Sequence, residues 1–111
     1  MNRLLLQARL AERGAVRYTP AGLAALDLSL KHESEVSEDG QARKVSMEMK
    51  AVAIGAITQA LLPLGLGSEA LFGGFITSTR NGRGLLFHLT SVAPGSTPET
   101  DRNPSGLINF S

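Results

Sequence analysis

The sequence predicts an all-β protein, a five-stranded barrel with one short helix between the third and fourth strands. Three observations support this prediction. Stretches of alternating apolar and polar residues, typical of half-buried strands, recur along the chain. One stretch changes to a helical spacing, and an Asn-Gly pair at residues 81–82 joins the last two alternating stretches as a hairpin. With 111 residues, the chain is long enough for one domain with a core of ordinary size.

The first predicted strand covers residues 3–11, which alternate loosely. Its polar face also carries Leu5, which suits a contact with a second sheet or subunit. A connection over residues 14–22 follows. Because Pro20 restricts its own φ and Gly22 can adopt a positive φ, we expect a tight turn in this connection.

The next two predicted strands cover residues 23–33 and 42–53. In the earlier one, leucines alternate with polar residues such as Asp27 and Ser29 in a clean period of two. The segment between them, residues 34–40, is acidic and short of apolar side chains. This composition predicts a solvated loop.

The second half of the chain begins with a change of period. Apolar residues over 54–64 fall on one helical face, and glycines end that segment. Residues 70–79 and 84–93 then form a predicted hairpin. The resulting order is β-β-β-α-β-β, and a five-stranded, partly open barrel with a helix after its third strand is the OB-fold. The order alone leaves other small all-β folds open.

The composition divides the chain into two regions. Residues 1–93 are expected to form the OB-fold domain. From Pro94 the chain becomes rich in Pro, Gly, Ser and Thr, so we expect residues 94–111 to be a flexible C-terminal tail.

Several classes of protein are disfavoured by composition. The chain has no cysteine, which suits a reducing compartment, and no apolar run approaches the roughly 18 residues that span a bilayer. We therefore expect a cytoplasmic protein without membrane contact. The net charge of +1 argues against a strongly basic nucleic-acid binder, although the charge is uneven along the chain.

No combination of residues in the sequence predicts catalysis. There is no phosphate-binding glycine motif and no nucleophile elbow, and the two histidines lack companion ligands at metal-binding spacing. We expect a protein that is not an enzyme and that needs neither a cofactor nor a metal.

Basic and aromatic residues near the predicted turns are the candidate DNA-binding residues. In an OB-fold, the loops after the first strand and between the last two strands border the nucleic-acid face. Guanidinium and ammonium groups there would contact phosphates, and a tyrosine would stack on a base. The candidates are Arg13, Arg17, Tyr18, Arg43, Lys44, Lys50, Arg80 and Arg83.

The same segments resemble a known family. The stretches Arg17-Tyr18-Thr19-Pro20-Ala21-Gly22, Leu30-Lys31-His32-Glu33-Ser34 and Gly74-Phe75-Ile76 are similar to the primosomal replication protein N (PriB) group of single-stranded DNA-binding OB-fold proteins. The resemblance covers residues 2–93. It implies an OB-fold homodimer that binds single-stranded DNA and associates with the PriA helicase and DnaT when a stalled replication fork is reloaded.

Two features depart from that family. Members can present aromatic residues before and on the third strand, whereas residues 40–46 contain none. Since each stacked base is worth about 1–3 kcal/mol, we expect binding that is weak, electrostatic and sensitive to salt. The tail beyond residue 93 also extends past the family pattern.

The sequence therefore predicts an accessory protein of the replication-restart primosome that bridges single-stranded DNA and the PriA helicase. The near-neutral charge and the missing aromatic residues leave an alternative open. The chain would then be an OB-fold protein-interaction module with little DNA affinity of its own.

Overall fold

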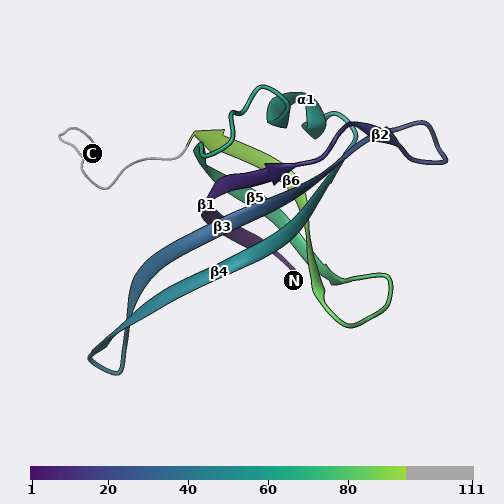
Figure 1. The fold of residues 1–111 in the computed structure, drawn as a ribbon. Coiled ribbons are helices and arrows are strands. Elements are labelled where there is room, and N and C mark those ends of the chain that lie inside the picture. Colours follow the sequence, from purple (N-terminus) through teal and green to yellow (C-terminus); the bar gives the residue numbers. More distant parts are fainter. Residues whose placement is uncertain (95–111) are drawn as a thin grey trace.

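The computed structural model describes residues 1–94, which fold into a β-barrel with one short helix packed beside it (Figure 1). The helix α1 is Ile57–Leu61. The strands are β1 (Leu4–Arg13), β2 (Arg17–Tyr18), β3 (Ala24–Glu38), β4 (Gln41–Ile54), β5 (Glu69–Ser78) and β6 (Leu85–Pro94).

Strand pairing closes the barrel. The sheet has the order β1-β5-β6-β4-β3-β2, and a further pairing of β1 with β3 joins the two sides of the sheet. The β4–β6 pairing is parallel and covers only Ala51–Ala53 on β4; the other pairings are antiparallel. The predicted five-stranded barrel is confirmed. The two-residue strand β2 was not predicted, and with it in the numbering the helix lies between β4 and β5.

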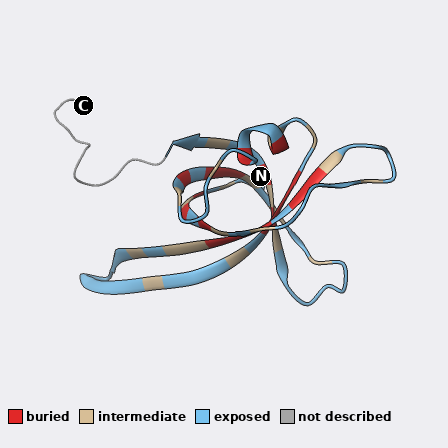
Figure 2. Ribbon diagram, turned by 45° about the horizontal axis from the view of Figure 1, so that its top comes forward, coloured by how far each residue is buried: buried red, intermediate tan, exposed pale blue. Residues whose placement is uncertain are grey.

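Alternating side chains of the long strands fill the core. The largest fully buried side chains include Leu10, Leu30, Phe72 and Phe87, which come from four different strands. Helix α1 adds Leu61, which is completely buried. Burial of each such side chain stabilises the fold by roughly 1.5–3 kcal/mol. Figure 2 shows buried residues in the strands of the barrel and in the helix, whereas the far part of the β3–β4 hairpin is exposed or half-buried.

The expected solvated loop over residues 34–40 is wrong. Strands β3 and β4 stay paired as far as Glu38↔Gln41, so only Asp39 and Gly40 form the turn. Both residues have positive φ, 51° and 77°. A two-residue hairpin turn of the type that matches strand twist needs positive φ at both positions, and Asp-Gly favours it. The turn chemistry therefore outweighs the acidic composition.

The chain beyond the last strand is described only in part. Pro94 ends β6, opposite Ala70. Apart from Pro94, the tail predicted over 94–111 lies outside the described residues. Within residues 1–94, no helix has the length and apolar character needed to cross a membrane.

Candidate nucleic-acid interface

The connection after β2 is a compact turn built around Thr19. The backbone N–H of Thr19 donates to the carbonyl of Leu23 at 2.8 Å, and the hydroxyl of Thr19 accepts a hydrogen bond from the Leu23 N–H at 3.1 Å. The Gly22 N–H donates to the Thr19 carbonyl at 2.8 Å, and Gly22 has a φ of 86°. The tight turn predicted at Pro20 and Gly22 is confirmed, and it holds β2 against β3.

The β5–β6 loop has the same construction around Thr79. Its N–H donates to the Gly84 carbonyl at 2.8 Å, and its hydroxyl accepts from the Gly84 N–H at 3.1 Å. The Asn81 side-chain oxygen accepts from the Thr79 hydroxyl at 2.7 Å and from the Arg83 N–H at 3.0 Å. These bonds fix the loop that carries Arg80 and Arg83. Both turns lie on the side of the barrel away from the tip of the β3–β4 hairpin (Figure 1).

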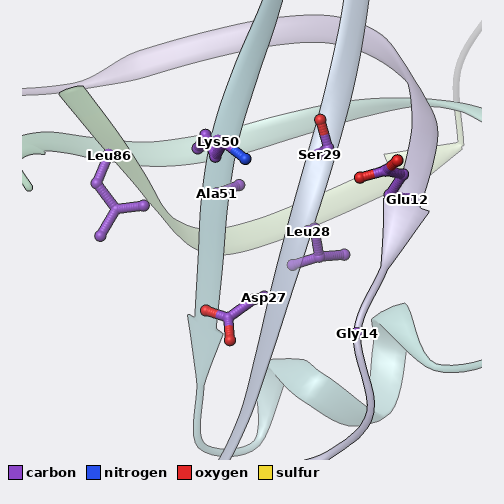
Figure 3. Close-up of a pocket in the computed structure, with 8 residues that line it drawn as sticks. All are labelled: Glu12, Gly14, Asp27, Leu28, Ser29, Lys50, Ala51 and Leu86. Atoms are coloured by element: carbon purple, nitrogen blue, oxygen red, sulfur yellow. The ribbon is translucent and has the colours of Figure 1, made fainter. Parts of the chain in front are cut away.

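A shallow groove crosses the outer surface of β1, β3 and β4. Strand register places Glu12 opposite Ser29, and Ser29 opposite Lys50, so these three residues form one row across the strands. Figure 3 shows them in the groove with Asp27 nearby and Leu86 at its β6 side. Lys44 and Ser46 lie further along β4 on the same face as Lys50, as the alternation predicts.

Arg17 does not project freely from its turn. Its guanidinium donates two hydrogen bonds to the Asp27 carboxylate, at 2.8 Å and 3.0 Å. These bonds raise the pKa of Arg17 and hold the pKa of Asp27 below its ordinary value of 3.8. Tyr18, beside it, is 71% exposed, so its ring is open to stacking rather than packed on the barrel.

The cations of the β3–β4 hairpin lie close to carboxylates. Arg43 pairs with Glu38 at 3.0 Å. Lys44 lies directly opposite Glu35 in the strand register, on the same face. The acidic residues that were expected in a separate loop therefore face the basic residues of the neighbouring strand.

Arg13 has a structural partner. Its guanidinium donates hydrogen bonds to the carbonyl oxygens of Leu61, at 3.4 Å, and Leu64. These carbonyls lie at and just beyond the end of α1, where backbone acceptors have no helical partner. Arg13 thus ties β1 to the helix.

Arg80 and Arg83 differ from the other candidate arginines. Both are exposed, and within the described part of the chain neither takes part in an ion pair. Their loop is held by its own backbone and by Thr79 and Asn81, so both guanidinium groups remain available to an external anion.

The sequence interpretation missed one ring pair on the outer surface. Phe75 and His88 stack with ring centroids 4.8 Å apart and an interplanar angle of 12°. Their direct opposition in the β5–β6 register is the signal that reveals the pair. His32 instead makes hydrogen bonds to the Gln7 carbonyl at 2.7 Å and the Ser34 hydroxyl at 2.8 Å. Within residues 1–94, no three His, Cys, Asp or Glu side chains come together as a metal-binding group.

Comparisons with known proteins agree on one group. The family model described as "Another single-strand binding protein family" matches residues 2–91. Replication restart protein PriB of Bordetella pertussis is 49% identical over 80 residues, which are 72% of this chain and 75% of that protein. The protein of the same name from Nitrosomonas europaea is 30% identical over 89 residues, 79% of this chain and 82% of that one.

Solved structures show the same likeness. PriB from Ralstonia solanacearum superposes with a TM-score of 0.78 at 30% identity, covering 86% of this chain and 99% of that one. The single-stranded DNA-binding protein of Thermus aquaticus gives a TM-score of 0.68 at 24% identity, covering 88% of this chain and 52% of that one. The second comparison establishes the fold alone.

Proposed function

Since the chain belongs to the PriB family of single-strand binding proteins, we propose that it is a non-catalytic protein that binds single-stranded DNA during replication restart. DNA would lie along the outer face of β3 and β4, between the turn around Thr19 and the loop around Thr79 (the two threonine turns). Phosphates would meet Arg80, Arg83 and Lys50, and Tyr18 would stack on a base.

The main support for this proposal comes from the β5–β6 loop. Its two arginines are exposed, lack carboxylate partners among the described residues, and extend from a loop fixed by Thr79 and Asn81. Such a loop loses little conformational freedom when it binds a phosphate backbone. Arg17, Arg43 and Lys44 would contribute less because each must first leave, or share, a carboxylate neighbour. Arg13 would act by holding α1 in place.

The proposal extends to partners. The chain would act as a homodimer in the cytoplasm, and it would bridge DNA to the PriA helicase and to DnaT. Exposed Leu5 and Phe75 on the outer face of β1 and β5 offer an apolar surface for a second copy. Holding DNA and helicase together raises the concentration of one near the other, which needs no chemistry from this chain.

The pairing of cations with carboxylates supports a second candidate function. Arg17, Arg43 and Arg9 each form an ion pair with a carboxylate, which lowers the potential that would attract DNA. The second candidate is an OB-fold module that binds partner proteins and has little DNA affinity.

A salt titration of DNA binding distinguishes the two candidate functions. Anisotropy of a labelled oligo-dT is measured with the parent chain and with Arg80→Ala/Arg83→Ala over a series of salt concentrations. For single-stranded DNA, each phosphate contact makes the slope of log K (the binding constant) against log salt concentration about 0.7 more negative. Losing two contacts should therefore make the slope about 1.4 less steep. We expect this flatter slope, together with weaker binding, for the double variant.

A matched control removes a cation that already has a partner. Arg43→Ala deletes the guanidinium bonded to Glu38 and should leave the slope almost unchanged. If the double variant binds as tightly as the parent at every salt concentration, the loop assignment is wrong. If the parent itself does not bind oligo-dT, the protein-interaction module is the better description.

A further inference from the structure

The ion pair between Arg17 and Asp27 lies on the surface where DNA is proposed to bind. Arg17 comes from the short strand β2 and Asp27 from β3, and the guanidinium donates to both carboxylate oxygens, at 2.8 Å and 3.0 Å. The two side chains are 52% and 60% exposed, so a ligand on this surface can reach the pair. A guanidinium binds phosphate through the same two parallel N–H···O bonds. The Asp27 carboxylate therefore occupies the donors with which Arg17 would bind a phosphate.

Asp27 also lies in the groove on β1, β3 and β4 (Figure 3). Lys50, one of the cations proposed to meet phosphates, lines the same groove. In the β3–β4 register, Asp27 lies opposite Val52, which is two residues along β4 from Lys50. Such diagonal neighbours share a face and are within reach of a long side chain. The negative charge of Asp27 thus also lowers the positive potential around Lys50.

We propose that Asp27 is an internal competitor of DNA, which limits the affinity of this surface for phosphate by holding Arg17. When single-stranded DNA binds, a phosphate replaces the Asp27 carboxylate on the guanidinium. This inference rests on the proposed function, because it concerns the same DNA-binding face.

The exchange requires movement of side chains only. Strand β2 is paired with β3 through the backbone, at Arg17↔Ala25 and Tyr18↔Ala24. The turn that follows is held by hydrogen bonds of Thr19, which do not involve the ion pair. Tyr18 can therefore stay in position while Arg17 changes its partner.

A purely structural role for the ion pair gives the opposite prediction. If Asp27 served only to hold β2 and the ring of Tyr18 in place, removing its charge would leave DNA binding unchanged or weaken it. If Asp27 competes with DNA, removing its charge makes binding tighter. The sign of the effect therefore distinguishes the two roles.

Anisotropy of a labelled oligo-dT tests the inference on four proteins: the parent, Asp27→Asn, Arg17→Ala and the variant with both changes. The asparagine is neutral and has nearly the same shape. It keeps the backbone carbonyl of residue 27, which accepts a hydrogen bond from the Gly14 N–H at 2.8 Å. Asp27→Ala leaves Arg17 no side-chain acceptor at this position and should tighten binding at least as much as Asp27→Asn.

The expected effect of Asp27→Asn is the gain of about one phosphate contact. The slope of log K against log salt concentration should become about 0.7 more negative, which corresponds to roughly eightfold tighter binding at about 0.05 M salt and roughly threefold at about 0.2 M. Arg17→Ala alone should change binding little, because its guanidinium is already occupied. The variant with both changes should lose most of the gain.

Glu12→Gln is the matched control. Glu12 lines the same groove, and within residues 1–94 it takes part in no ion pair. This variant removes the same charge from the groove without releasing a guanidinium. Its effect on binding should therefore be the same in the parent and in Arg17→Ala.

The possible outcomes separate this inference from the proposed function. If the parent binds oligo-dT and Asp27→Asn binds it no more tightly, the inference is wrong and the proposed function stands. A gain that is equal with and without Arg17 has the same meaning. If Asp27→Asn binds oligo-dT and the parent does not, the inference stands and DNA binding by the parent is wrong. Absence of binding by all four proteins overturns both.

Discussion

At the scale of single residues, acidic neighbours decide which cations are available. Asp27 holds Arg17 with two hydrogen bonds, whereas Arg80 and Arg83 have no such partner within residues 1–94. A phosphate that approaches Arg17 must compete with a carboxylate already in bidentate geometry. Proximity to a predicted DNA-binding turn is therefore insufficient to assign a contact.

The Arg17–Asp27 pair should make stability depend on pH. The pKa of Asp27 is lower in the folded protein than in the unfolded chain, where it is about 4. The stabilisation from the pair is therefore fully present above about pH 4, and it is lost as the pH falls through the lowered pKa of the folded protein. The free energy of unfolding, measured in urea at about pH 7 and about pH 3, should fall less for Asp27→Asn than for the parent. Asp39→Asn, at the hairpin tip, is the control and should retain the full decrease of the parent. An equal decrease in the parent and Asp27→Asn would show that the pair contributes nothing.

At the scale of elements, the periodicity of the sequence predicted the strands, whereas the turn residues determine where the strands end. The alternation predicted each long strand, and the helical spacing over 54–64 predicted a helix, because each pattern reports on a buried face. The helix α1 is shorter than that segment: it covers Ile57–Leu61, and the half-exposed Ile54 ends β4. The loop expected over 34–40 was wrong because its acidic composition was given more weight than Asp39-Gly40. The Arg17–Asp27 pair was not predicted, since it depends on the register of the short strand β2 against β3. Of the candidate site, the Asn-Gly signal located the Arg80 loop, but periodicity carries no information on ion pairs.

The β5–β6 pairing should tolerate no side chain at Gly74. The register shifts between Gly73 and Gly74, and a Cβ at Gly74 would lie 1.8 Å from the carbonyl oxygen of His88. Backbone must move to relieve such a contact, so we expect Gly74→Ala to lower the free energy of unfolding by about 3 kcal/mol. Urea denaturation gives this value. Gly84→Ala is the control, because its Cβ would meet Thr79 at an ordinary 3.6 Å, and it should cost well under half as much. Equal stability of the two variants would contradict the close approach.

At the scale of the whole molecule, the barrel presents surfaces of different character in different directions. The groove on β1, β3 and β4 is lined by charged side chains that include Glu12, Asp27 and Lys50. The β3–β4 hairpin extends away from the turns around Thr19 and Thr79 (Figure 1), and the outer face of β1 and β5 is apolar around Leu5. A small barrel with separate faces can bind several partners at once. Its near-neutral net charge of +1 is then the result of opposing local charges rather than of an absence of charge.

The apolar face predicts self-association through β1 and β5. Leu5 is 54% exposed and lies beside Gly73, while Phe75 is 39% exposed and stacked on His88, so burying this face would remove a sizeable apolar area from water. Light scattering at micromolar concentration should give a dimer mass for the parent and a mass shifted toward the monomer for Leu5→Asp. Leu66→Asp is the control, because Leu66 is exposed but lies in the connection between α1 and β5, and it should remain dimeric. A monomeric parent, or an unaffected Leu5→Asp, would remove this face as the interface.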